Sequence, residues 1–185
     1  MPFRHPFEWL TVAGQKRAFV VTTILALLVM ATLQVLGGPL RTAAAPASII
    51  SYELAGTLAR AQDMVASWGE RERVFAGLGL GVDYLFMVAY ASAIGLGCVL
   101  VARGLFERGR GLARFGVLLA WGQWLAALLD ALENYGLIRV LLGAQAEFWP
   151  VLARWCAIPK FLLVGLGLLY VIVGGAATLV RRRGG

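Results

Sequence analysis

Four ionisable residues fall inside long apolar stretches of this sequence: Asp83, Asp130, Glu133 and Lys160. At bilayer depth an ionisable side chain costs at least about 2.5–3.5 kcal/mol, so such residues usually pair with one another and mark functional sites. Three carboxyl groups beside one lysine cannot all be ionised cheaply in a dry site. A protonated carboxyl group next to an ionised one is the arrangement that acid–base catalysis and proton transfer use.

The composition places these residues in a membrane protein. The chain has 185 residues, of which 60% are hydrophobic and only 15% charged, and its mean hydropathy is +0.78. Soluble domains are about 45–50% apolar and about 25% charged. The sequence therefore excludes an ordinary soluble enzyme, a disordered chain and a disulfide-stapled secreted domain.

Four stretches are long enough to cross a bilayer, which takes about 20 mostly apolar residues: 19–37, 74–102, 112–142 and 149–180. The first exceeds the apolar core of a signal peptide, so we expect it to be an uncleaved span. We predict an all-α integral membrane protein, a four-helix bundle that forms a single domain over 1–185.

Basic residues predict the orientation of the bundle. They cluster before the first span, between the second and third spans, and after the fourth, and the positive-inside rule assigns these segments to the cytoplasm. We expect both termini on the cytoplasmic side of the cytoplasmic membrane of a bacterium. The net charge of +7 then reflects this orientation and does not indicate a nucleic-acid-binding surface. The basic residues are Arg4, Lys16, Arg17, Arg103, Arg108, Arg110, Arg114, Arg181, Arg182 and Arg183.

The external connection over 38–73 is too long for a turn. Apolar residues recur in it at steps of three and four, which predicts an amphipathic helix over about 48–68. Two compatible interpretations stay open: a helix that rests on the outer leaflet, or a lid over a cavity between the spans. The apolar positions are Ile50, Leu54, Leu58, Ala61, Val65 and Trp68.

Counted at 1.5 Å per residue, the four ionisable residues lie at one depth, about 14–18 Å from the outer ends of their spans. We therefore predict one cluster, in which Asp83 or Asp130 is the general acid or base, Glu133 its partner and Lys160 an electrostatic stabiliser. Residues on the same or adjoining helix faces are the candidates for substrate binding. They are Asn134, Tyr84, Tyr90, Gln123, Trp124 and Met87.

These residues favour a membrane enzyme or binding protein for a lipophilic or amphiphilic molecule, with membrane lipids as further partners. Two alternatives stay open: a proton- or cation-coupled transporter, and a structural protein whose charges only fix helix register. We expect no metal and no cofactor, because the sole histidine, His5, lies outside the apolar stretches. Small residues at four-residue spacing in the second span leave self-association open.

Overall fold

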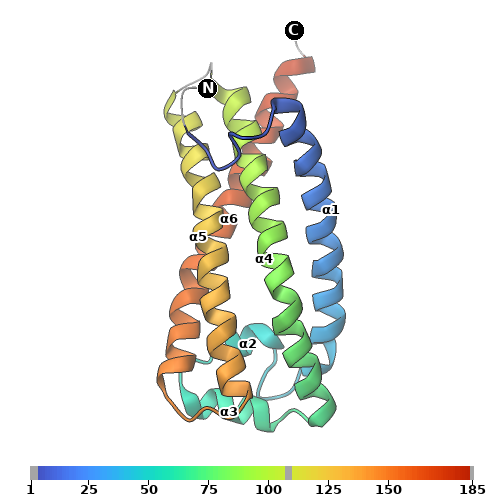
Figure 1. Ribbon diagram of the computed structural model, residues 1–185, viewed down its shortest axis with the longest axis vertical. Helices are drawn as coiled ribbons and strands as arrows, with labels where there is room; N and C mark the ends of the chain where they lie inside the picture. Colours follow the sequence, from blue (N-terminus) through green and yellow to red (C-terminus); the bar gives the residue numbers. More distant parts are fainter. Residues whose placement is uncertain (1–3, 107–109, 184–185) are drawn as a thin grey trace. The chain divides into compact units, whose positions relative to one another are not determined.

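The computed structural model describes residues 4–106 and 110–183, and all regular structure in these residues is helical. Arg108 of the second basic segment lies outside the described residues. Figure 1 shows the order of the elements along the chain. They are α1 (Val12–Gly37), the short 3-10 helix η1 (Gly38–Leu40), α2 (Ile49–Glu53), α3 (Leu58–Ala66), α4 (Glu70–Leu105), α5 (Arg110–Leu141) and α6 (Phe148–Arg183).

Four helices are long and apolar enough to cross a membrane, as the sequence predicted: α1, α4, α5 and α6. Each is longer than the stretch predicted from hydropathy, because polar residues continue the helix beyond the apolar run. Large apolar side chains such as Val20, Leu28 and Ile172 are more than half exposed. Such exposure is favourable against lipid tails and costly in water, so the surface fits a multi-pass membrane protein.

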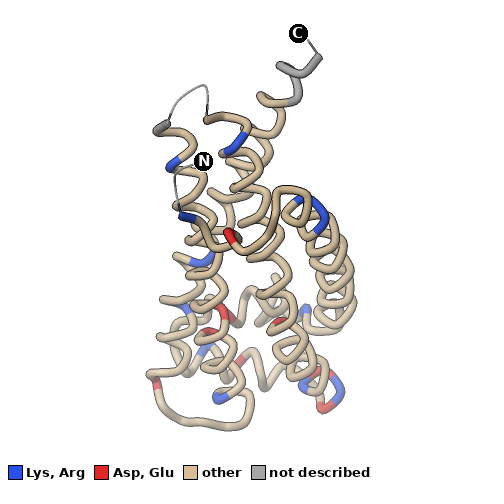
Figure 2. The backbone as a smooth tube through the Cα atoms, turned by 45° about the horizontal axis from the view of Figure 1, so that its top comes forward, with Lys and Arg blue, Asp and Glu red and all other residues tan. Residues whose placement is uncertain are grey.

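The chain divides into two compact units, and each of the four long helices contributes a segment to both. Unit 1 comprises 1–26, 88–127 and 161–185, and unit 2 comprises 27–87 and 128–160. Unit 1 contains ten Lys or Arg and two Asp or Glu residues, whereas unit 2 contains seven and eight. Figure 2 shows how sparse these charges are along the tube. That the chain is a single membrane domain stays a prediction.

Unit 1 is held together by closely packed helices. The position that a Cβ atom would take on Gly97 of α4 lies 2.9 Å from Val171 of α6 and 3.1 Å from Phe19 of α1. Buried amide groups in this unit bind backbone carbonyls: Gln123 Nε2 donates to Leu163 O at 2.9 Å. Because only glycine leaves room at position 97, the small residues here serve helix contact.

Unit 2 contains the connection between α1 and α4, which we call the cap (residues 38–69). The predicted single helix over 48–68 is in fact two short helices, α2 and α3. The chain turns between them at Gly56, which has a φ of +72° that L-residues rarely adopt. As a result Ile50 and Leu54 are exposed, although Ala61 and Trp68 are buried as expected. Whether the cap rests on a leaflet stays a prediction.

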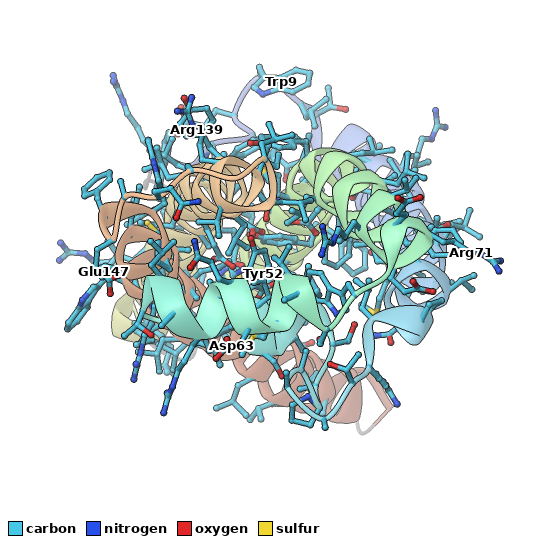
Figure 3. All side chains as sticks on the ribbon, turned by 90° about the horizontal axis from the view of Figure 1, so that it is seen from below. Trp9, Tyr52, Asp63, Arg71, Arg139 and Glu147 are labelled. Carbon is cyan, nitrogen blue, oxygen red and sulfur yellow. The ribbon has the colours of Figure 1, made fainter. Side chains whose placement is uncertain are left out.

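The cap is fastened to the rest of unit 2 by buried side chains. Tyr52 Oη of α2 donates to Leu137 O of α5 at 3.0 Å, and Trp68 Nε1 donates to Leu40 O at 3.0 Å. The two rings also pack edge to face with centroids 5.3 Å apart. Figure 3 shows Tyr52 at the centre of this end, with Arg71, Arg139 and Glu147 towards its periphery. Glu53 follows Tyr52 directly, so the anchoring of Tyr52 also fixes the position of Glu53.

Candidate functional site

Lys160 of α6 is the centre of a buried ionic cluster in unit 2. Its Nζ lies 2.8 Å from Glu133 Oε2, 3.0 Å from Asp130 Oδ1 and 3.6 Å from Glu53 Oε2. Lys160 is 6% exposed, Asp130 3% and Glu133 0%. The three carboxyl groups come from α2 and α5, so this one ammonium group joins three helices. An ammonium group has three N–H donors, and three carboxyl groups surround the one here.

Asp83 of α4 and Asn134 of α5 form a second polar pair in unit 2. Asn134 Nδ2 donates to Asp83 Oδ2 at 2.7 Å, and Asn134 is 1% exposed. An N–H donor on one carboxylate oxygen fixes the orientation of the carboxyl group. The amide therefore orients Asp83 and leaves its other oxygen, Oδ1, for a further partner.

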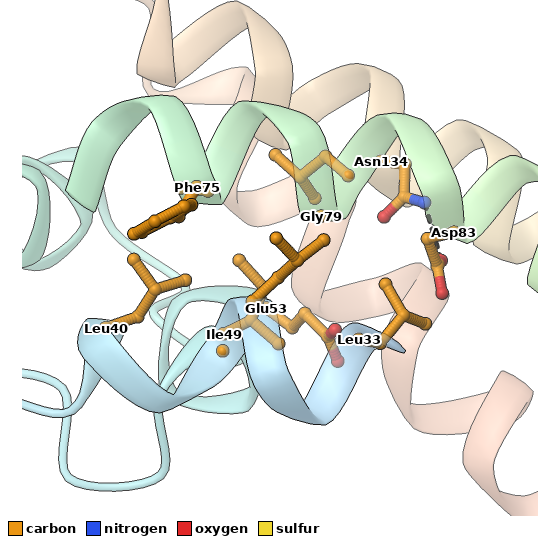
Figure 4. A pocket seen from close by; sticks show the side chains of 12 residues that line it. Leu33, Leu40, Ile49, Glu53, Phe75, Gly79, Asp83 and Asn134 are labelled. Atoms are coloured by element: carbon orange, nitrogen blue, oxygen red, sulfur yellow. Dashed lines mark hydrogen bonds between the residues drawn. The ribbon is translucent and has the colours of Figure 1, made fainter. Parts of the chain in front are cut away.

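An apolar cavity of about 60 Å³ lies beside this pair. Leu40, Ile49 and Phe75 lie at one end of it, and Asp83 and Asn134 lie at the other (Figure 4). A Cβ atom on Gly79 would meet nothing within 4 Å, so this glycine leaves space open. The twelve residues that line the cavity are Leu33, Leu36, Gly37, Leu40, Ile49, Glu53, Phe75, Ala76, Gly79, Leu80, Asp83 and Asn134.

Glu53 connects the cavity with the ionic cluster, because it lines the cavity and also pairs with Lys160. Sequence reasoning missed Glu53, because this residue lies outside the long apolar stretches in which the candidate site residues were sought. Burial raises the pKa of Glu53 above its ordinary value, and the nearby Lys160 offsets part of that rise. Glu53 directly follows the buried Tyr52, and the fold of the cap sets its position. The spacing of apolar residues in the sequence does not predict this position.

Five of the residues proposed from the sequence come together in unit 2: Asp83, Asp130, Glu133, Asn134 and Lys160. The matching depths were therefore a useful guide to position. Their catalytic and binding roles stay predictions.

The other proposed residues are divided between the two units. Met87 is a buried residue of unit 2, and Tyr84 Oη of the same unit donates to Ala131 O at 3.2 Å. Tyr90, Gln123 and Trp124 belong to unit 1. There the ring of Trp124 packs 6.4 Å from that of Phe7. Binding roles for these residues stay predictions.

The chemistry available in unit 2 is that of carboxyl groups, one amide and one ammonium group. Within the described residues no group of His, Cys, Asp and Glu side chains is arranged to hold a metal ion. Cys98 and Cys156 are both buried and free. No protein-family model, no curated protein and no solved structure matches this chain.

Proposed function

We propose that this chain is a multi-pass membrane protein that binds a lipophilic or amphiphilic molecule in the cavity of unit 2 and acts on it by acid–base chemistry. The observation that carries this proposal is the cavity itself, which has apolar walls and ends on an oriented carboxyl group. Ligand sites are commonly mostly apolar with a few convergent polar groups. Asp83 meets that description because it lines the cavity and is held by Asn134.

In this proposal the polar residues of unit 2 have different roles. Asp83 is the general acid or base, since it has an oxygen available on the cavity side, and Asn134 is its positioning residue. Asp130, Glu133 and Lys160 hold the helices in register and set the charge around the cavity. Glu53 links the two groups, because it lines the cavity and also pairs with Lys160.

One observation also favours a second function, a proton or cation relay. Unit 2 holds Glu53, Asp83, Asp130 and Glu133 in its interior beside a single lysine, and this surplus of carboxyl groups suits proton carriage. A relay predicts proton flux in proteoliposomes under an imposed pH gradient, and loss of that flux in Asp130→Asn. The amphiphile proposal predicts no such flux.

A photoreactive alcohol tests whether the cavity binds. The purified chain in a maltoside detergent is irradiated with a six-carbon alcohol that carries a diazirine, and labelled residues are mapped by mass spectrometry. We expect labelling at the cavity walls, in 33–40 and 75–83, and its loss in Gly79→Leu, which fills the cavity. Gly81→Leu is the matched control, because Gly81 of the same helix also faces open space and does not line the cavity. Equal labelling of both variants would contradict the proposal.

The orientation is part of the same proposal: both termini face the cytoplasm of a bacterium and the cap faces outside. Arg17 and Asp63 are exposed, and the native cysteines are buried, so introduced cysteines report cleanly. We expect an impermeant thiol reagent added to intact cells to label Asp63→Cys and to spare Arg17→Cys. Labelling of Arg17→Cys instead of Asp63→Cys would show that the orientation is the opposite of the one proposed.

A further inference from the structure

We propose that the cavity of unit 2 takes a positively charged head group, so that its ligand is an amphiphile with a protonated amine. This inference rests on the proposed function and names the class of substrate. It follows from which polar groups of the cavity are already used and which remain.

Lys160, which pairs with the cavity residue Glu53, is already surrounded by carboxyl groups. Lys160 faces Glu53, Asp130 and Glu133 at 3.6, 3.0 and 2.8 Å and is 6% exposed. A phosphate, sulfate or carboxylate ligand would have to displace one of these partners, which would leave a buried carboxylate without its counter-ion. Lys160 therefore does not recruit an anionic head group.

The polar end of the cavity offers acceptors and almost no donors. Its ionisable members are Glu53 and Asp83, and none of the twelve residues that line it is basic. The amide of Asn134 already donates to Asp83 Oδ2. A ligand that donates hydrogen bonds and carries positive charge complements these two carboxyl groups, whereas a ligand that only accepts hydrogen bonds is left with the second N–H of Asn134.

Glu53 supplies a second and independent observation. Its Oε2 atom is buried and makes no hydrogen bond, and its ion pair with Lys160 is the longest of the three. The Glu53 carboxyl group also lines the cavity, so a cationic ligand there would share this weakly paired group with Lys160.

The size of the cavity limits the head group further. Its volume of about 60 Å³ is the space open to the centres of water-sized groups, so a compact primary ammonium group with its first methylene groups suits it better than a bulky sugar or phosphocholine group. The remaining alkyl chain would lie over apolar α1 side chains of the same unit, such as Leu28 and Val35, which are 63% and 76% exposed.

Competition against the diazirine alcohol tests the head group directly. Three competitors share one six-carbon chain and differ in charge: hexylammonium, hexanol and hexanoate, each added near neutral pH. We expect hexylammonium to halve the labelling of 75–83 at a concentration about tenfold below that of hexanol, with hexanoate the weakest. Hexyltrimethylammonium keeps the charge but enlarges the head group and removes its N–H donors, so we expect it to lose most of this advantage.

Matched variants assign the preference to the cavity. Asp83→Asn removes a charge at constant shape, and we expect it to bring hexylammonium and hexanol to within about threefold of each other. Asp63→Asn removes an exposed charge of α3 in the same unit and should leave the tenfold preference intact. Asp63→Asn should keep wild-type labelling by the alcohol probe, and a circular-dichroism spectrum like that of wild type shows that Asp83→Asn is folded.

The outcomes separate this inference from the proposed function. If the alcohol labels the cavity but all three competitors act alike, the amphiphile site stands and the cationic head group is wrong. If hexanoate competes best, the ionic cluster opens to anions and the inference is overturned. If Gly79→Leu leaves the labelling unchanged, the cavity does not bind and both proposals fail.

Discussion

The two units differ in how their buried polar side chains find partners. In unit 1, buried polar groups such as Gln15 and Gln123 bind backbone carbonyls, and glycines bring helices into direct contact. In unit 2, ionisable side chains meet one another and leave a cavity beside Gly79. The Oε1 atoms of Gln15 and Gln123 are buried without a hydrogen bond. A neutral amide is nevertheless less costly to bury than a charged group, and buried ion pairs seldom improve stability. Unit 2 therefore has the more costly interior of the two, and this cost is consistent with the function that we propose for it.

The comparison predicts its largest effect at Lys160. Lys160→Met leaves three carboxyl groups without their common counter-ion, and breaking a buried ion pair from one side costs about 3–5 kcal/mol. The free energy of unfolding, measured by SDS titration in detergent, should fall by that amount. Arg139→Gln is the control, because Arg139 is exposed and stacks on Trp149, a contact worth about 0.5–1 kcal/mol. Equal losses in the two variants would mean that the three carboxyl groups do not depend on Lys160 as their counter-ion.

Glycine substitutions should have opposite signs in the two units. In unit 1, Gly97→Ala places a methyl group 2.9 Å from Val171, and overpacking of this kind costs about 1–3 kcal/mol. In unit 2, the methyl group of Gly79→Ala meets nothing within 4 Å. Alanine is a better helix former than glycine, by about 0.5–1 kcal/mol, so this variant should be more stable than wild type. The same SDS titration measures both, and a loss in Gly79→Ala would show that the space at Gly79 is already filled.

A smaller effect is expected where the cap meets α5. Tyr52→Phe removes the hydrogen bond to Leu137 O and leaves that buried carbonyl without this donor, at a cost of about 1 kcal/mol. The free energy of unfolding should fall accordingly, while Tyr135→Phe, a change on an exposed ring of α5, should stay within about 0.5 kcal/mol of wild type. If both changes were neutral, packing alone would anchor the cap.

Hydropathy and helical rise predicted much of this arrangement, because both follow from the chain itself. The described residues include four helices that are long and apolar enough to cross a membrane. The depths counted for Asp83, Asp130 and Lys160 agreed, and the structure places these three residues in one unit. Gln123 shows the limit of the method. It shares a helix face with Asp130 but lies seven residues earlier, about 10 Å along α5, and its amide binds Leu163 O.

Glu53 was missed for a different physical reason. Its place depends on the turn at Gly56, where the backbone is left-handed, and on the anchoring of Tyr52 by a carbonyl of another helix. The apolar period of the cap predicted one continuous helix, and neither feature leaves a mark on that period. Irregular segments are positioned by tertiary contacts, so a charged residue in a loop is harder to assign than one in a span.

The smallest effect that we predict is a dependence of stability on pH, and it comes from Glu53. Burial raises its pKa in the folded chain, so between the ordinary glutamate pKa of about 4.3 and the raised value the folded state holds a proton that the unfolded state has released. Stability from this group is therefore complete at low pH and is lost as the pH rises through the raised pKa. The glutamine side chain of Glu53→Gln is neutral at every pH, so this variant does not lose stability in this way as the pH rises.

Thermal unfolding in detergent between about pH 5 and pH 8 measures this contribution. We expect the melting temperature of wild type, relative to that of Glu53→Gln, to fall as the pH rises, whatever the difference at the lowest pH. Asp63→Asn, the exposed acid of α3, should run parallel to wild type. A difference between wild type and Glu53→Gln that stays constant over this range would mean that Lys160 outweighs burial and keeps Glu53 ionised. The cavity would then present a fixed negative charge, with which an amine ligand pairs at every pH of the series.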